Sequence, residues 1–173
     1  MKRYLNLPYE DAEIRSIKAG DDVILSGILY VGRDQVHKRL YESLGKELPF
    51  SFDKNAIYYM GPSPALPGFA IGAAGPTTSA RMDSFSPSLI KAGLKVMVGK
   101  GPRSAAVVEA VKECKGLYLQ AYGGCGALYA SRIKSSEIVA YPELGPEALL
   151  RLEIEDFPVI CTIDSEGNSL YRV

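Results

Sequence analysis

The sequence predicts an α/β fold in one domain, with a β-rich N-terminal part followed by alternating strands and helices. The chain has 173 residues, enough for one domain with a sizeable core. Hydrophobic residues make up 47% of it and charged residues 23%, which is ordinary for a globular protein. Short apolar runs alternate with segments of helical periodicity, which is typical of βαβ units and a parallel sheet. No internal repeat or long linker divides the chain.

The first elements follow from apolar runs and the residues that bound them. Residues 23–31, VILSGILYV, are apolar and rich in β-branched side chains, which predicts a strand. Residues 33–44 follow with helical spacing, and Gly45 is a suitable helix stop. Residues 56–60, AIYYM, predict the next strand.

The second half of the chain continues the alternation. A short helix is expected at 86–93, with Ser86 as its cap, Pro87 in its first turn and Gly93 at its end. The later elements share clear apolar periodicity: strands at 95–98, 116–121, 138–141 and 159–164, and helices at 103–113, 124–133 and 146–154. Residues 164–168, DSEGN, predict a hairpin turn before a last strand at 169–172.

The overall charge argues against two classes of partner. Lysine plus arginine and aspartate plus glutamate both number 20, so no net field attracts nucleic acid or an anionic membrane. The N-terminus lacks the apolar run of a signal peptide, and no stretch approaches the roughly 20 apolar residues of a membrane span. We therefore expect a cytoplasmic protein with no nucleic-acid and no membrane partner.

The most informative segment is GPTTSARMD at residues 75–83. It combines turn formers, three hydroxyl groups and Arg81 within nine residues. Such a loop can place hydroxyl and backbone N–H donors around a small anion, and an arginine can bind a carboxylate through two parallel hydrogen bonds. A plain loop that leads through a proline turn into a helix would have the same composition. The segment alone leaves both interpretations open.

Two further cations follow predicted strands. Lys100 lies between two glycines after the strand at 95–98, and Arg33 lies between a strand and a helix. Ligands of α/β sheets bind at such positions. A solvated lysine in a turn, and a surface arginine paired with Asp34, are the plainer interpretations. The full phosphate-loop pattern, GxxxxGK[ST], is absent, so nucleotide binding has little support.

The cysteines and the one histidine do not predict a metal site. Cys114, Cys125 and Cys161 are widely spaced, with neither a CxxC pair nor a nearby histidine. Cys125 could be a reactive thiol at a helix start, but a small buried residue among glycines is the favoured interpretation. His37 stands beside basic residues, and a surface or packing role is expected for it.

Taken together, these segments resemble the β subunit, or C-terminal domain, of class I iron–sulfur fumarate hydratases and the related L-tartrate dehydratases. The resemblance rests on GRD at 32–34, HKR at 37–39, GPTTSARMD at 75–83, GKG at 99–101, GGCGAL at 123–128 and residues 153–158. The run at 75–83 is highly specific and the others moderately so. Only the first 15 or so residues fall outside the resemblance.

The resemblance implies a swivelling β/β/α domain over residues 1–173, acting as the β subunit of a hydro-lyase that hydrates fumarate to L-malate. In that family an α subunit holds a [4Fe–4S] cluster on three cysteines. None of the three cysteines here matches a cluster-ligand motif, so the resemblance assigns this chain no metal ligand. It also implies a heterotetramer of two α and two β chains, and hence self-association of β subunits.

Three alternatives stay open: an L-tartrate dehydratase β subunit, a non-catalytic assembly module of such a complex, and a stand-alone anion-binding protein. A carboxylate-binding motif does not distinguish fumarate from L-tartrate, because both acids have two carboxylates. The absence of a complete nucleotide or phosphate motif counts against the stand-alone protein.

The resemblance also implies roles for individual residues. The substrate-binding residues would be Arg33, Thr77, Thr78, Arg81 and Lys100. Thr77 would in addition take part in proton abstraction. A neutral threonine is a very poor base, so it needs a carboxylate; Asp83 is the local candidate, and an aspartate of the α subunit is favoured. The site would then lie between subunits, and the isolated chain would be inactive.

Overall fold

Seven strands form one mixed sheet in the order β1-β2-β3-β4-β5-β7-β6. The computed structural model describes residues 1–65 and 67–171. The strands are β1 (Lys2–Leu7), β2 (Asp22–Val31), β3 (Ala56–Tyr58), β4 (Val96–Gly99), β5 (Leu117–Gln120), β6 (Ile133–Ala140) and β7 (Leu149–Ile163). The helices are α1 (Asp11–Ser16), α2 (Asp34–Glu42), α3 (Ser86–Lys91), α4 (Ala105–Cys114) and α5 (Gly126–Ser131), with 3₁₀ turns η1 (Ser79–Met82) and η2 (Pro142–Glu147).

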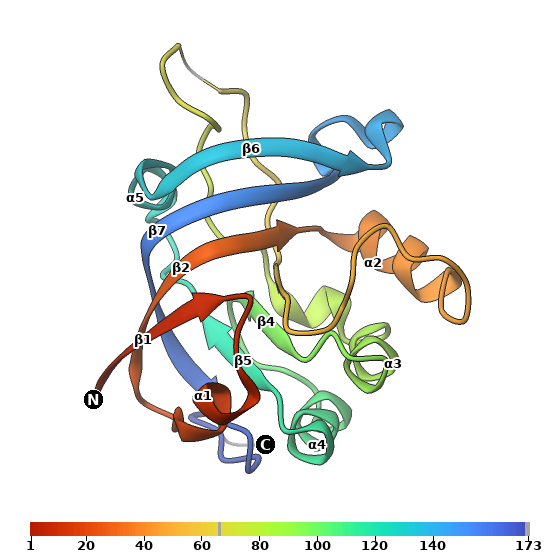
Figure 1. Ribbon diagram of the computed structural model, residues 1–173, viewed down its shortest axis with the longest axis vertical. Coiled ribbons are helices and arrows are strands. Elements are labelled where there is room, and N and C mark those ends of the chain that lie inside the picture. Colours follow the sequence, from red (N-terminus) through yellow and green to blue (C-terminus); the bar gives the residue numbers. More distant parts are fainter. Residues whose placement is uncertain (66, 172–173) are drawn as a thin grey trace.

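The strand pairings close into a ring. Strands β1 to β5 pair in parallel, as the alternation of strands and helices predicts. Strand β7 runs antiparallel to β2 and also to β5, so β2, β3, β4, β5 and β7 form a closed circuit of pairings. Strand β6 pairs with β7 outside this circuit, and β1 flanks β2. The 15 residues of β7 are long enough to contact three neighbours in turn (Figure 1).

Alternate residues of the central strands pack into two separate hydrophobic clusters, because successive side chains of a strand point to opposite faces. Tyr58 of β3 belongs to one cluster, with Phe157 of β7. Met97 of β4 belongs to the other, which also holds Leu89 of α3 and Val111 of α4. Helices α2, α3 and α4 gather on one side of the sheet, where they cover this second cluster (Figure 1).

The predicted helix at 146–154 is wrong. The chain forms η2, which kinks at Gly145, and then enters β7 at Leu149. Leu150, Leu152 and Ile154 are buried, whereas the residues between them are more exposed, which is the period of two of a strand. Apolar residues spaced in this way also fit one face of a short helix, so the local pattern could not decide between the two.

The prediction of a parallel sheet is correct only for β1 to β5. Strands β6 and β7 are antiparallel to their neighbours, and β6 begins at Ile133, earlier than expected. The prediction of a β-rich N-terminal part is only partly correct. Helices α1 and α2 alternate with the first strands, and the longest strand, β7, lies near the C-terminus. The sequence patterns did not predict β1 or α1.

Turn and cap residues were predicted with mixed success. Gly93 directly follows the C-cap of α3 with a positive φ of 114°, as a helix stop does. Gly45 also has a positive φ, of 80°, but it lies two residues beyond Ser43, the C-cap of α2. Ser86 is not a cap; it is the first residue of α3, and its hydroxyl donates to the Met82 carbonyl oxygen at 2.9 Å. The turn at 164–168 is present, but the strand expected after it is reduced to one bridge between Ile163 and Ser169 among the described residues. Arg172, its expected last residue, lies outside them.

Candidate functional site

The carboxyl ends of β2, β3 and β4 lie side by side and carry two of the predicted site residues. The Gly32 N–H donates to the Tyr58 carbonyl oxygen at 3.1 Å, and Tyr58 is paired with Val98 of β4. Arg33 follows β2, and Lys100 follows β4. Ligands of parallel sheets bind at this edge, because loops from neighbouring strands converge there.

The loop at 75–83 crosses the same edge. The Thr77 N–H donates to the Tyr59 carbonyl oxygen at 2.7 Å. Thr78 forms an isolated parallel bridge with Lys100, and the Ser79 N–H donates to the Lys100 carbonyl oxygen at 2.9 Å. Thr77 is half-buried and Thr78 is exposed. The structure thus brings Lys100 to the neighbouring residues Thr77 and Thr78, although it follows them in a later segment of the chain.

Arg81 and Arg33 each form an ion pair at this edge, with different partners. The Arg81 Nη2 donates to Asp34 Oδ2 at 2.7 Å, and Asp34 is the neighbour of Arg33 in the chain. The Arg33 Nε lies 3.5 Å from Glu147 Oε1. The Arg33 side chain also packs against Gly61, where an added Cβ would come within 2.6 Å of Arg33 Nη1. Arg33 is therefore not paired with Asp34, as the plainer interpretation supposed.

Two buried polar atoms at this edge lack hydrogen-bond partners in the described part of the chain. They are Arg33 Nε and Asp34 Oδ1. The Arg33 Nε lies close enough to Glu147 for an ion pair but makes no hydrogen bond with it. Buried polar groups without partners are rare and cost free energy. The segment that carries Arg33 therefore has unused hydrogen-bonding capacity close to Arg81.

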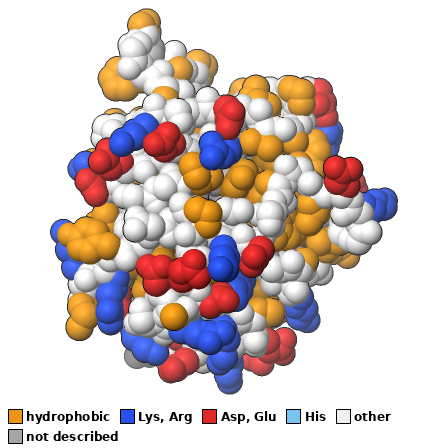
Figure 2. Space-filling model, viewed as in Figure 1, with side chains coloured by type: hydrophobic (Ala, Val, Ile, Leu, Met, Phe, Trp, Pro, Cys, Tyr) orange, Lys and Arg blue, Asp and Glu red, His pale blue; other side chains and the backbone are white. Residues whose placement is uncertain are grey.

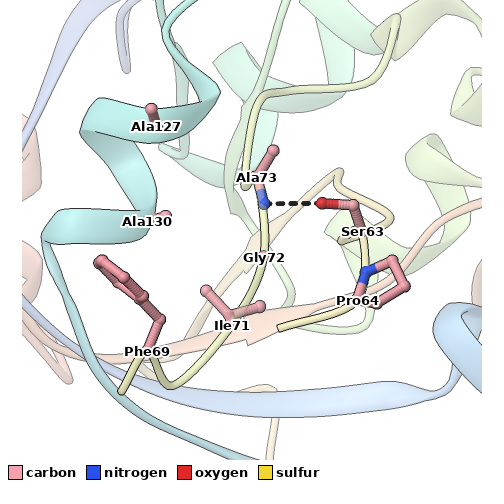
Figure 3. Close-up of a pocket in the computed structure, with 8 residues that line it drawn as sticks. All are labelled: Ser63, Pro64, Phe69, Ile71, Gly72, Ala73, Ala127 and Ala130. Carbon is pink, nitrogen blue, oxygen red and sulfur yellow. Dashed lines mark hydrogen bonds between the residues drawn. The ribbon is translucent and has the colours of Figure 1, made fainter. Parts of the chain in front are cut away.

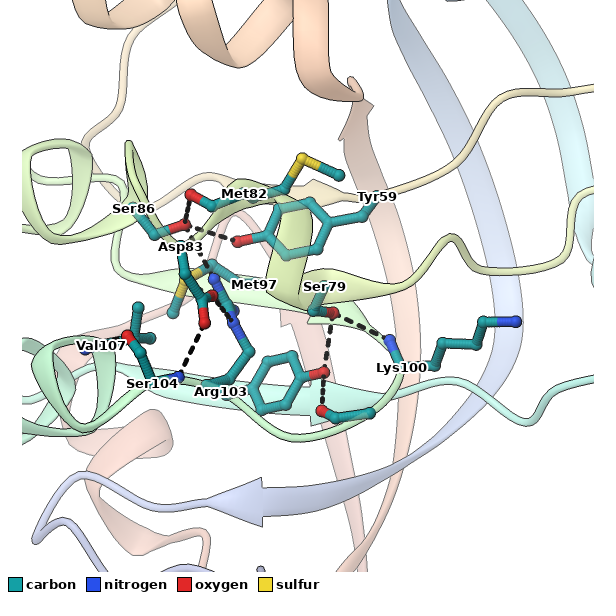
Figure 4. Close-up of polar contacts among 12 residues, drawn as sticks. Tyr59, Ser79, Met82, Asp83, Ser86, Met97, Lys100, Arg103, Ser104 and Val107 are labelled. Carbon is teal, nitrogen blue, oxygen red and sulfur yellow. Dashed lines mark hydrogen bonds and ion pairs between the residues drawn. The ribbon is translucent and has the colours of Figure 1, made fainter. Parts of the chain in front are cut away.

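Asp83 is engaged elsewhere. Its Oδ1 accepts from Arg103 Nε at 2.7 Å, and its Oδ2 accepts from the Ser104 N–H at 2.7 Å (Figure 4). Both carboxylate oxygens thus have charged or backbone donors. Asp83 is therefore poorly suited to accept a proton from Thr77, and the structure removes the local candidate for a base.

Sequence reasoning missed the polar residues beneath the loop. Ser79 is fully buried, and its Oγ accepts from the Lys100 N–H at 3.0 Å and from the Tyr118 hydroxyl at 2.8 Å (Figure 4). Arg103 is also buried, although the sequence suggested only that it opens a helix. Asp83 and Arg103 are 20 residues apart, so no local pattern connects them.

A cavity of about 350 Å³ lies away from these residues. It opens between residues 63–64 and 69–73 on one side and α5 on the other (Figure 3). Its lining is mostly apolar: Ser63, Pro64, Phe69, Ile71, Gly72, Ala73, Ala127 and Ala130. A small dianion needs cations and hydrogen-bond donors, so this cavity does not fit one. The candidate site is the edge that carries the cations, not this cavity.

The charged surface has no dominant sign on the face shown in Figure 2, where acidic and basic side chains are interspersed. This agrees with the equal numbers of acidic and basic residues. In the described part of the chain, no helix is both long and apolar enough to cross a membrane.

His37 packs beneath the candidate site. Its Nδ1 lies 2.8 Å from the Arg33 carbonyl oxygen, and its ring meets the Tyr59 ring edge-on at 5.0 Å. Burial, and secondarily the charge of Arg103, lower the pKa of His37 to about 4. The ring is therefore neutral near pH 7. Of the two expected roles, surface or packing, its burial fits the packing role.

The low pKa of His37 predicts acid sensitivity. Between pH 6.5 and about 4, the unfolded chain binds a proton at His37 that the folded chain does not, so the free energy of unfolding should fall as pH falls. The contribution lost by pH 4 is about 3 kcal/mol at most. Denaturant unfolding of wild type and His37→Gln across this range measures it. The wild type should lose more stability than the variant; parallel curves would contradict the prediction.

The three cysteines do not fit an iron–sulfur cluster. Cys114 ends α4, Cys125 precedes α5, and Cys161 is buried in β7, where burial raises its pKa to about 12. Within residues 1–65 and 67–171, no group of three or more histidine, cysteine or acidic side chains could hold a metal ion. Cys125 is half-buried and packs against the core, in line with the favoured interpretation.

Comparisons with known proteins give consistent results. The family described as "Fumarase C-terminus" matches residues 2–173. The match therefore includes residues 2–15, which the sequence resemblance had left out. The chain is 40% identical to the aerobic class I fumarate hydratase of Escherichia coli K12, over 97% of this chain and 32% of that protein. It is 38% identical to fumarate hydratase 2 of Leishmania major, over 92% of this chain and 29% of that protein.

A relative of similar length was also found. The chain is 35% identical to the L(+)-tartrate dehydratase subunit beta of Escherichia coli K12, over 98% of this chain and 87% of that protein. By contrast, it spans only about a third of the length of the fumarate hydratases that it matches.

Proposed function

The chain belongs to the Fumarase C-terminus family, and from this premise we propose that it is the β subunit of a two-subunit hydro-lyase that hydrates fumarate to L-malate. Residues 1–173 would form one swivelling β-type domain. A relative that is itself named as a beta subunit supports the two-subunit arrangement. The chain spans 87% of a protein named as a beta subunit but only 32% of a fumarate hydratase that carries the same region in a longer chain.

The observation that carries this proposal is the group of cations at one edge of the sheet. Arg33, Arg81 and Lys100 come from three separate segments. The loop that carries Arg81 also carries Thr77 and Thr78, and Thr78 is bridged to Lys100. The Arg33 Nε has no hydrogen-bond partner, and its ion pair with Glu147 is 3.5 Å long. This combination suits a small molecule with two carboxylates.

The chemistry explains why fixed cations would help. Removal of the proton at C3 of L-malate, the reverse reaction, builds negative charge on the adjacent carboxylate. Cations already in place stabilise that charge more in the transition state than in the ground state. Arg33, Arg81 and Lys100 would bind the two carboxylates, and Thr78 would donate a hydrogen bond. Thr77 would pass the proton to a carboxylate of the partner, because Asp83 is already paired with Arg103.

The remaining parts of the enzyme would come from the partner. The described residues of this chain do not fit a [4Fe–4S] cluster, so we assign the cluster and the base to an α subunit. Two α and two β chains would form the complex, with the β subunits self-associating. The three cysteines are free thiols, which suits a reducing cytoplasm.

A specific observation also supports L-tartrate as the substrate. The relative of matching length is named as a tartrate dehydratase subunit. Both acids carry two carboxylates, so the cations at the site would bind either, and the hydroxyl groups of tartrate would be distinguished by residues of the partner.

Anaerobic assays of the complex with a cluster-bearing α chain from the same source would decide between these substrates. We expect a higher kcat/KM for fumarate hydration than for L-tartrate dehydration. A clear preference for L-tartrate would assign the second function instead. A complex that contains the cluster and turns over neither acid would contradict both.

A further inference from the structure

Arg103 has a fully buried side chain, which is unusual for an arginine. Its Nε donates to Asp83 Oδ1 at 2.7 Å and its Nη2 donates to Ser86 Oγ at 2.8 Å. Its Nη1 lies 3.7 Å from the sulfur of Met97 (Figure 4). Every nitrogen of the guanidinium group thus has a partner inside the protein.

Two aromatic rings also hold the guanidinium group. Its central carbon lies 5.1 Å from the centre of the Tyr59 ring and 4.8 Å from that of Tyr118. Burial alone would lower the pKa of Arg103, but Tyr59, Asp83 and Tyr118 outweigh it and keep the pKa raised. The buried group is therefore charged.

A buried ion pair of this kind is an inefficient way to stabilise a fold, because both charges lose their hydration. Its clearest effect here is to hold neighbouring segments of the chain in place. Asp83 directly follows η1, the turn that carries Arg81, and Asp83 also accepts from the Ser104 N–H at the start of α4. Ser86, the second partner of Arg103, donates to the carbonyl oxygen of Met82, the last residue of η1.

The same group of residues continues to Lys100. The Tyr118 ring that packs on Arg103 carries a hydroxyl that donates to Ser79 Oγ, the first residue of η1, and Ser79 Oγ accepts from the Lys100 N–H. Both ends of η1 are thus fixed by residues that contact Arg103. No other element at this edge is held by a fully buried charge among the described residues.

We propose that Arg103 is a positioning residue of the hydro-lyase site. It contacts no substrate; it fixes η1 and Lys100 so that Arg81 and Lys100 approach the substrate at the angle that the transition state requires. This inference rests on the function proposed above. Displacing a catalytic group by about 1 Å can cost about 10²-fold in rate.

Three variants of the reconstituted complex test this role. Arg103→Lys keeps the charge but loses the planar set of donors. The double variant Arg103→Met with Asp83→Asn removes both charges, so no buried charge is left unpaired and folding should be retained. Asp164→Asn is the control, because Asp164 is equally buried and accepts several backbone N–H bonds beyond β7, at the opposite end of the sheet from the site.

We expect kcat for hydration to fall about 10²-fold in both Arg103 variants, with little change in KM, because Arg33 still binds the ground-state substrate. Asp164→Asn should lose stability without a comparable loss of kcat. Amide hydrogen exchange of the β chain provides a readout without activity. Exchange at residues 77–83 should accelerate in Arg103→Lys and stay unchanged in Asp164→Asn.

Three results would overturn the inference. If the wild-type complex is active and Arg103→Lys matches its kcat, Arg103 does not position the site, while the proposed function stands. If kcat in all three variants simply follows their loss of stability, its role is structural only. If the wild-type complex turns over neither acid, the proposed function fails, and the positioning role fails with it.

Discussion

Replacing Thr77 by valine should lower kcat of the reconstituted complex by about 10²- to 10⁴-fold, the usual range for a group that transfers a proton in the transition state. Valine keeps the shape of the side chain and removes only the hydroxyl. The Thr77 N–H still donates to the Tyr59 carbonyl oxygen at 2.7 Å, so the backbone of the loop should stay in place. Steady-state hydration kinetics and thermal unfolding of the same preparation would measure both effects.

The neighbouring Thr78→Val is the matched comparison. Thr78 is exposed and bridged to Lys100, and it is expected to supply one hydrogen bond to a carboxylate. Loss of the Thr78 hydroxyl should lower kcat/KM less than loss of the Thr77 hydroxyl, mainly by raising KM. A larger loss of kcat in Thr78→Val than in Thr77→Val would transfer the proton-transfer role to Thr78.

Replacing Arg81 by methionine should lower kcat/KM by about 10- to 150-fold. This range follows from the roughly 1.5 to 3 kcal/mol of a hydrogen bond to a charged group. Stability should change little, because the Arg81 pair with Asp34 is half-exposed and such surface pairs contribute about 0 to 1 kcal/mol. A large loss of activity without a loss of stability is therefore the expected pattern.

Arg3→Met provides a control for Arg81. Arg3 is also an arginine paired with a carboxylate, Asp21, but it lies at the opposite end of β2 from Arg33. The Arg3→Met variant should therefore keep the wild-type kcat/KM. The binding of the α subunit should be measured for both variants. If Arg81→Met weakens assembly and leaves the activity of the assembled complex intact, the chain is an assembly module, not a contributor to catalysis.

The parallel strands were predictable from the sequence because their signals are local. Residues 23–31 and 95–98 are short apolar runs bounded by polar or turn-forming residues, and the structure has β2 and β4 there. Strand β7 was predicted only in part. Its first half alternates Leu150, Leu152 and Ile154 with polar residues, and its strand identity depends on pairing with β2, more than 100 residues earlier in the chain. Long-range pairing of this kind leaves no local signature.

The candidate site was likewise predictable where the signal is local and unpredictable where it depends on distant residues. Arg33, Arg81 and Lys100 could be named because each lies in a distinctive turn after or between predicted elements. The ion pairs of these residues could not be predicted: Arg81 meets Asp34 across 47 residues, and Arg33 meets Glu147 from η2. The sequence placed Glu147 in a predicted helix at 146–154, but in the structure it is the last residue of η2. The sequence therefore offered no reason to expect its ion pair with Arg33. Arg103 was missed because a buried charge resembles a surface charge in sequence.

The central claim is that this chain supplies only part of an active site. The most direct test is anaerobic hydration of fumarate by three samples: this chain alone, a cluster-bearing α subunit alone, and an equimolar mixture. We predict turnover in the mixture only, with Arg81→Met reducing it as described. Turnover by this chain alone at the rate of the mixture would contradict the claim.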